Sequence, residues 1–301
     1  MVRIEDFAFD IANTKYYGHV MININDWIST SVLRQINLRG KVLPTKITKV
    51  VKVNPAPAYR PLPIKEGDVI ALSAIATRIG LLRGFNIPGD TNDYASVHMS
   101  QILGYFKNGD ITIDSFVPLY DKVVMKKVEV RDSSFIDIAD DNMSVGEVIA
   151  TGEGGFDSDW KRREMKVKVG TRVLIRDNVS TSLLLDGETY YVTDDKYVLG
   201  EFPTKEYTLD NFVPYDDVNI FKEYEEEMLQ GGVLFKPVYD KDVEISQSYQ
   251  DNIFELVVSK DIEPGIYYIS RFDTEYVKFK GKTYFVVNKD KIMAKKAKGE
   301  S

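Results

Sequence analysis

The feature of this sequence that most constrains its fold is a short pattern that occurs three times along 301 residues. Each copy has an apolar residue, two further residues, a glycine and then an apolar stretch typical of a strand. The three glycines are Gly67, Gly170 and Gly265, and they are 103 and 95 residues apart. This spacing predicts tandem repeats, each about the size of a small domain.

Each copy is followed by an apolar closing segment with a small residue in its third position. The small residues are Gly104, Gly200 and Ala294, which lie 37, 30 and 29 residues after the glycine of the same copy. The longer first distance predicts an insertion around residues 83–92. We therefore expect three domains, at residues 1–110, 111–205 and 206–301.

Strand signals dominate the chain. Segments such as 123–125, 173–175, 190–192 and 284–287 are short, rich in β-branched or aromatic residues and bounded by turn-forming residues. The 18 Tyr and 15 Phe residues suit half-buried pleated surfaces. Amphipathic helical periodicity is confined mainly to residues 27–38 and 223–229. The expected fold class is all-β.

The composition excludes several functional classes. With no Cys and only two His, the chain cannot form disulfides, thiolate zinc sites or a Cys nucleophile. Its 39 basic and 46 acidic residues give a net charge of −7, which argues against general affinity for nucleic acid or anionic membranes. Because adjacent carboxylates such as Asp194 and Asp195 are usually solvated in turns, we expect no enzymatic activity, metal or cofactor.

The sequence also predicts a cytoplasmic location. Glu5 and Asp6 stand where a secretory signal would carry basic and then apolar residues. The most apolar run, residues 69–82, is short and interrupted by Arg78, so it is not expected to span a bilayer.

The middle repeat carries a more specific order of motifs. An opening segment at 118–127 is followed by Gly146-Glu147-Val148-Ile149-Ala150-Thr151-Gly152, by Val167-Lys168-Val169-Gly170 and by a closing Val198-Leu199-Gly200. This order resembles a GroES-type co-chaperonin domain, although Thr171 stands where the family has an acidic residue. The third repeat keeps the opening, the turn and the ending, and the first resembles the family more loosely. The resemblance implies three tandem GroES-like small β-barrels.

The resemblance also implies a partner-binding loop between the first two strands of a domain. In the family this loop holds two glycines followed by apolar residues that dock on the chaperonin. The third repeat offers Gly231, Gly232, Val233, Leu234 and Phe235 at this position. The alternative for the apolar triplet is an ordinary buried strand, because an apolar run cannot be assigned by pattern alone.

The other two repeats lack the double glycine. The second offers Phe135, Ile136 and Ile138, and the first offers Trp27 and Ile28. For these weaker candidates we favour local packing or inter-domain contact over docking, because large apolar side chains are usually buried.

Two functions are consistent with these features. The first is a co-chaperonin-like protein, possibly encoded by a bacteriophage, that forms a homo-oligomeric ring and caps a chaperonin to assist protein folding. Since one loop binds weakly, this function requires several loops on one assembly. The alternative is a structural protein of a virion, such as a ring, collar or tail component of a tailed phage, that uses the domains as building blocks. The location would then be the host cytoplasm or the virion.

Overall fold

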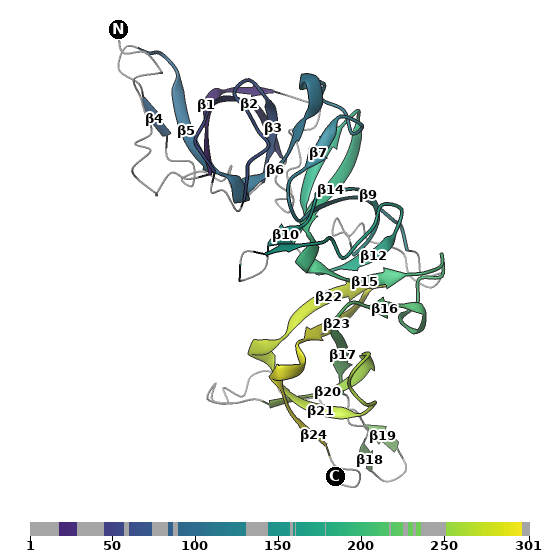
Figure 1. Cartoon of the computed structure of the whole chain (residues 1–301). Coiled ribbons are helices and arrows are strands. Elements are labelled where there is room, and N and C mark those ends of the chain that lie inside the picture. The colour runs from purple at the N-terminus through teal and green to yellow at the C-terminus, as the bar shows by residue number, and fades with distance from the viewer. Residues whose placement is uncertain are drawn as a thin grey trace. The chain divides into compact units, whose positions relative to one another are not determined.

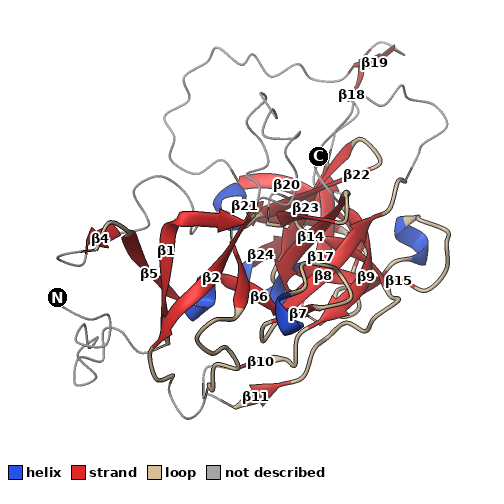
Figure 2. Ribbon diagram, turned by 90° about the horizontal axis from the view of Figure 1, so that it is seen from above, coloured by secondary structure: helices blue, strands red, loops and turns tan. Residues whose placement is uncertain are grey.

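Strands make up nearly all of the regular structure. The computed structural model describes residues 18–28, 45–56, 60–73, 84–86, 90–130, 144–156, 159, 161–177, 179–216, 218–224, 228–230, 233–235 and 251–296. Within these residues the only helical elements are one-turn 3-10 helices (Figure 2). The all-β prediction is confirmed. Among the described residues, no helix has the length and apolar character needed to cross a bilayer.

The first sheet contains seven antiparallel strands in the order β4-β5-β1-β2-β3-β6-β7 (Figure 1). They are β1 (His19–Ile28), β2 (Lys46–Val53), β3 (Val69–Leu72), β4 (Gly84–Asn86), β5 (Asp93–His98), β6 (Ile102–Phe106) and β7 (Phe116–Pro118). β-Branched residues are frequent in β1 and β2, as expected for strands that present one face to a core.

The second sheet has the order β13-β14-β8-β9-β12-β15-β16. Its strands are β8 (Lys122–Lys127), β9 (Val145–Thr151), β12 (Arg172–Ile175), β13 (Thr181–Leu185), β14 (Glu188–Asp194), β15 (Val198–Phe202) and β16 (Val213–Pro214). A separate ribbon pairs β10 (Gly155–Phe156) with β11 (Arg162–Arg163).

The third sheet has six strands in the order β22-β23-β17-β20-β21-β24. They are β17 (Asn219–Glu223), β20 (Asp251–Val258), β21 (Ile266–Ser270), β22 (Glu275–Phe279), β23 (Lys282–Val287) and β24 (Ile292–Lys295). A second ribbon pairs β18 (Met228–Gln230) with β19 (Val233–Phe235).

The three sheets have the same strand order. In each, the first three strands along the chain lie side by side, the following hairpin pairs with the first strand, and the closing strand pairs with the third. In the first two sheets a strand from the start of the next repeat is added outside the closing strand. The described pairings close none of these sheets into a barrel, so the predicted barrels are open sheets in this structure.

The chain divides into two compact units that do not coincide with the three repeats. One comprises residues 1–128, 139–171 and 179–197, and the other comprises 129–138, 172–178 and 198–301. In the first unit, the first and second sheets share an apolar cluster, which includes Ile47, Val69, Leu103, Phe106, Phe116, Val124, Leu183, Leu185 and Val192. In the second unit, a separate core gathers Phe221, Phe254, Tyr267, Ile269 and Val287.

The repeated glycines lie directly before the third strand of each sheet. Gly67 and Gly170 have φ of +87° and +84°, a conformation that glycine adopts far more readily than other residues. Gly265 is not among the glycines with positive φ, so the reason for a glycine differs in the third repeat. All three turns bond to the second strand of their sheet, through the amides of Val50, Val148 and Leu256.

Both predicted helices are wrong in their described parts. Trp27 and Ile28 belong to β1, and Glu223 and Met228 lie in β17 and β18. The rest of 27–38 lies outside the described residues. Six residues separate β4 from β5, whereas two separate β13 from β14. The insertion around residues 83–92 stays a prediction, because residues 83 and 87–89 lie outside the described residues.

Candidate functional site

The candidate docking residues of the third repeat lie in the connection between β17 and β20. Val233, Leu234 and Phe235 form β19, which pairs with β18 in the register Leu229 with Leu234 and Gln230 with Val233. Gly231 and Gly232 separate these strands and lie outside the described residues. The apolar triplet is therefore a strand, but it belongs to a two-stranded ribbon and not to the main sheet. An isolated ribbon of two strands is marginally stable in water, so packing on another surface would stabilise it.

The ends of this connection are held together by the main sheet. Glu223 pairs with Phe254, and the Tyr224 amide donates to the carbonyl of Ile253 at 2.9 Å. The equivalent connection in the second repeat is closed in the same way, because the Val128 amide donates to the Val145 carbonyl at 2.9 Å. Each connection thus leaves and returns to adjacent positions on a sheet, as a binding loop on a rigid scaffold does.

The weaker candidates are distributed differently. Trp27 and Ile28 end β1 and pack against two apolar clusters, and the Lys46 ammonium lies 4.4 Å from the centroid of the Trp27 ring. Phe135, Ile136 and Ile138 lie outside the described residues. The use of any of these residues in docking stays a prediction.

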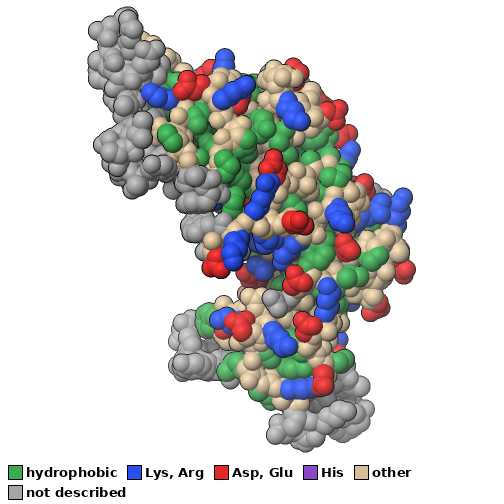
Figure 3. All heavy atoms as spheres, in the orientation of Figure 1, with side chains coloured by type: hydrophobic (Ala, Val, Ile, Leu, Met, Phe, Trp, Pro, Cys, Tyr) green, Lys and Arg blue, Asp and Glu red, His purple; other side chains and the backbone are tan. Residues whose placement is uncertain are grey.

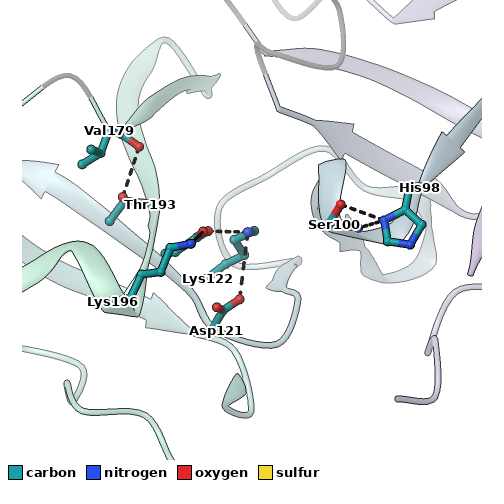
Figure 4. A network of polar contacts seen from close by, with 8 residues as sticks. His98, Ser100, Asp121, Lys122, Val179, Thr193 and Lys196 are labelled. Carbon is teal, nitrogen blue, oxygen red and sulfur yellow. Dashed lines mark hydrogen bonds and ion pairs between the residues drawn. The ribbon is translucent and has the colours of Figure 1, made fainter. Parts of the chain in front are cut away.

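A polar network crosses the second sheet at the start of β8. Lys122 forms ion pairs with Asp194 and Asp121, and Asp194 also pairs with Lys196 at 3.7 Å (Figure 4). On the adjoining strand, the Thr193 hydroxyl donates to the carbonyl of Val179 at 3.2 Å. The ion pair between Lys122 and Asp194 joins β8 to β14 at the start of β8, and the loop between β8 and β9 leaves the opposite end of this strand.

Asp195 corrects an expectation from the sequence. Its side chain is fully buried, whereas we expected a solvated turn carboxylate. It accepts from Arg163 Nη1 at 2.8 Å and from the Lys166 amide at 3.3 Å, so it holds β11 against the second sheet. Burial of a carboxylate requires such partners. The pairing gives Asp195 a structural role.

The two histidines meet in the first sheet. His19 and His98 are opposite each other on β1 and β5, with ring centroids 5.0 Å apart. His98 also caps a 3-10 helix by accepting from the Ser100 amide (Figure 4). Burial lowers the pKa of His19, with a smaller contribution from His98, and burial also lowers the pKa of His98, with a smaller contribution from Arg60. Both rings thus favour the neutral form.

The described surface carries both signs of charge. Acidic and basic side chains are interspersed on the face shown in Figure 3. Several form exposed pairs, such as Lys126 with Glu188 at 2.6 Å and Lys222 with Glu255 at 2.8 Å. In the part of the chain that the structure describes, no three His, Cys, Asp or Glu side chains gather as a metal site requires.

Two short strands pair with sheets other than those of the repeats in which they lie. β7 and β16 belong by sequence to the second and third repeats, but they complete the sheets of the preceding ones. Their signal was the shared run Asp-X-Phe-Val-Pro at residues 114–118 and 210–214, together with Gly104 and Gly200 in the closing strands. Nothing in the sequence indicates that each of these runs pairs with the closing strand of the preceding sheet.

Comparison with known proteins assigns the middle of the chain. Residues 115–202 match the family of the chaperonin 10 kDa subunit. The chain is 39% identical over 88 residues to the co-chaperonin GroES of Hydrogenobaculum sp. (strain Y04AAS1), which covers 27% of this chain and 92% of that protein. It is 34% identical over 91 residues to co-chaperonin GroES 1 of Rhodopseudomonas palustris, covering 29% of this chain and 93% of that protein.

The matched region contains six of the seven strands of the second sheet, all except β16, together with β7 of the first sheet. Residues 115–202 run from β7 to the end of β15 and include the polar network and the buried Asp195. The recognised resemblance of the middle repeat is thereby confirmed. Through this domain, the chain belongs to the GroES family of chaperonin 10 kDa subunits.

Proposed function

We propose that the chain is a co-chaperonin-like protein built from three tandem GroES-like domains. The observation that carries this proposal is the strand order, which is the same in the first and third sheets as in the matched middle sheet. The bonds between the glycine turns and the second strands are a second shared feature. We place the domain boundaries near residues 110 and 205, as the repeat spacing predicts, with β7 and β16 crossing them.

Each domain would present one loop, between its first and second strands. The loops lie between β1 and β2, between β8 and β9, and between β17 and β20. Docking would use Gly231 to Phe235 in the third domain and, more weakly, Phe135 to Ile138 and Trp27 to Ile28 in the others. A groove between chaperonin helices can accept such a short apolar segment.

The magnitudes favour several loops acting together. Burial of Val233, Leu234 and Phe235 yields about 1.5–3 kcal/mol each. Ordering some ten loop residues costs about 1–2 kcal/mol each, so one loop alone binds weakly. Loops that are joined in one chain raise each other's effective concentration. Three domains in a single chain supply part of this effect, and assembly into a ring would supply more.

Co-sedimentation with a chaperonin in the presence of nucleotide tests the proposal. The wild-type chain is expected to sediment with the chaperonin, and a variant with Val233→Asp and Leu234→Asp is expected to stay in the supernatant. Phe272→Asp is a matched control, because Phe272 is 92% exposed in the same domain but outside the loop. Retained binding by the double variant would remove the docking segment from the proposal.

The alternative function is that of a structural component in a virion or another assembly. The apolar cluster shared by the first two sheets supports it, because such a cluster joins domains into one block. This alternative predicts no chaperonin binding. Native mass spectrometry of the purified chain tests the ring that both functions use, since a stable monomer would contradict the ring in either case.

A further inference from the structure

The strand that joins one repeat to the preceding sheet is held in the same way at both junctions. At the first, Gly104 pairs with Pro118 and Phe106 with Phe116. At the second, Gly200 pairs with Pro214, the equivalent register. The rings of Phe106 and Phe116 have a centroid distance of 5.1 Å and an interplanar angle of 51°, and those of Phe202 and Phe212 have values of 5.3 Å and 52°. The backbone also agrees, since the amides that donate to Leu103 and Leu199 do so at 3.0 and 2.9 Å.

Each junction requires a glycine in the closing strand. A Cβ at Gly104 would lie 2.5 Å from Phe116 Cζ and would overlap the carbonyl oxygen of Val117. A Cβ at Gly200 would lie 2.6 Å from Phe212 Cζ and 2.7 Å from the Pro214 Cα. These neighbours are strand backbone and a ring that is only 4% exposed in both cases, so neither can move aside freely.

The closing strand of the third sheet has the same place and register. β24 pairs with β21 as β6 pairs with β3, with the irregularity at the same step of the ladder. The pairing of Ala294 with Tyr268 corresponds to that of Gly104 with Ala71. Lys296, whose amide donates to the Ile266 carbonyl at 2.8 Å, corresponds to Phe106 and Phe202. β24 therefore has the methyl group of Ala294 in place of the glycine, and it is followed by the ammonium of Lys296 in place of the phenylalanine ring.

The surroundings of β24 suit a strand edge that stays in contact with solvent. Met293, Ala294 and Lys295 are exposed. Lys295 forms an ion pair with Glu263 at 3.0 Å, and the Lys296 ammonium lies 5.6 Å from the centroid of the Tyr224 ring. Lysines on an edge strand are a common device against pairing with another chain.

We propose that β24 excludes the Phe-bearing strand that links the repeats inside the chain, so that a second copy cannot extend the series through it. The excluded partner is a strand with the Asp-X-Phe-Val-Pro pattern, whether from residues 114–118 or 210–214 of another copy. This inference rests on the equivalence of the three sheets in the proposed function. Exclusion at β24 would restrict this kind of strand pairing to the two junctions inside the chain. Copies that assemble would then do so through other surfaces.

Binding of a labelled peptide to the full chain tests the proposal. The peptide has the sequence of residues 208–216, and its affinity is measured by fluorescence anisotropy for the wild type and for Ala294→Gly with Lys296→Phe. We expect the variant to bind the peptide at least tenfold more tightly than the wild type does. A peptide with Phe212→Ala is the matched control and is expected to lose this gain.

The proposal would be overturned if the variant binds the peptide less than tenfold more tightly than the wild type, which includes the cases in which both proteins bind equally or neither binds. It would also be overturned if the control peptide shows the same increase in affinity. Both changes are on a partly or fully exposed strand, and thermal unfolding checks that the variant remains folded. If it does not, Ala294→Gly alone is measured, with a gain of at least threefold expected and a smaller one overturning the proposal. Chaperonin co-sedimentation depends on the loop between β17 and β20, so failure of the proposed function is read separately.

Discussion

Replacing Gly200 with alanine tests the packing of the second junction directly. The added methyl would meet Phe212 Cζ at 2.6 Å and the Pro214 Cα at 2.7 Å, distances that real Cβ atoms do not show. The chain can respond in two ways. It can keep β16 in place and accept the overpacking, which costs about 1–3 kcal/mol. Alternatively, it can release β16 from β15.

Release of β16 costs more than strain. It exposes Phe212, which is worth about 1.5–3 kcal/mol, and it breaks an aromatic pair worth about 0.5–1.5 kcal/mol. It also breaks the hydrogen bond of 2.9 Å from the Tyr215 amide to the Leu199 carbonyl, worth about 1 kcal/mol. Because overpacking costs less than release of β16, we expect Gly200→Ala to lower the free energy of unfolding by about 1–3 kcal/mol.

Urea unfolding measures this loss, and hydrogen exchange at the Tyr215 amide reports whether the strand remains in place. The matched control is the reverse change in the third sheet, Ala294→Gly, which should cost at most about 1 kcal/mol because Ala294 is exposed and, among the described strands, β24 pairs with β21 alone. Phe212→Leu in the Gly200→Ala background should recover part of the loss, since it removes the ring atom in contact. A loss below about 0.5 kcal/mol with unchanged exchange at Tyr215 would refute the packing argument.

Three further predictions concern other parts of the fold. Since the pKa values of His19 and His98 are lowered in the folded state, the unfolded state takes up protons more readily, and stability should fall as the pH drops below about 6.5. The urea midpoints at pH 7.5 and 5.5 should differ less in a variant with His19→Gln and His98→Gln than in the wild type. An unchanged difference would contradict this prediction. Gly170→Ala should cost at least about 1 kcal/mol because the φ of Gly170 is +84°. Gly265→Ala should cost less, because the close contact of its added methyl is with the flexible end of the Lys295 side chain and the Tyr267 ring lies at an ordinary van der Waals distance. Equal thermal shifts of the two variants would exclude this reason. Arg163→Met should destabilise the chain by about 2–4 kcal/mol in urea unfolding, because it leaves a fully buried carboxylate without its cation; a cost below 1 kcal/mol would show that the pair is not needed.

The all-β class could be predicted from the sequence because strand propensity and turn residues are local patterns. Glycine before an apolar strand and the closing segments recur at regular spacing, and the structure places them at equivalent positions in three sheets. The segment at residues 27–38 shows the limit of local reasoning. Its apolar spacing favours a helix, but Trp27 and Ile28 lie in β1, where pairing with β2 determines the conformation.

The pairing of β7 with β6 and of β16 with β15 could not be predicted from the sequence, because each pair joins segments assigned to different repeats. The sequence spacing predicts a boundary near residue 110, and this boundary stays a prediction; the structure shows that β7, after this point in the chain, pairs with β6 before it. Burial of Asp195 was missed for a related reason. Its partner Arg163 lies in the β10–β11 ribbon, and no periodicity links the two residues.

The pairing of β7 and β16 with the preceding sheets affects how the polypeptide folds during translation. The first sheet lacks its outermost strand until residue 118 has left the ribosome, and the second waits in the same way for residue 214. Until then Phe106 or Phe202 lies uncovered at an unpaired edge, which is the kind of surface that aggregates. A fragment intended for isolated expression should therefore include β7 or β16 and end beyond Pro118 or Pro214, and not at the repeat boundary.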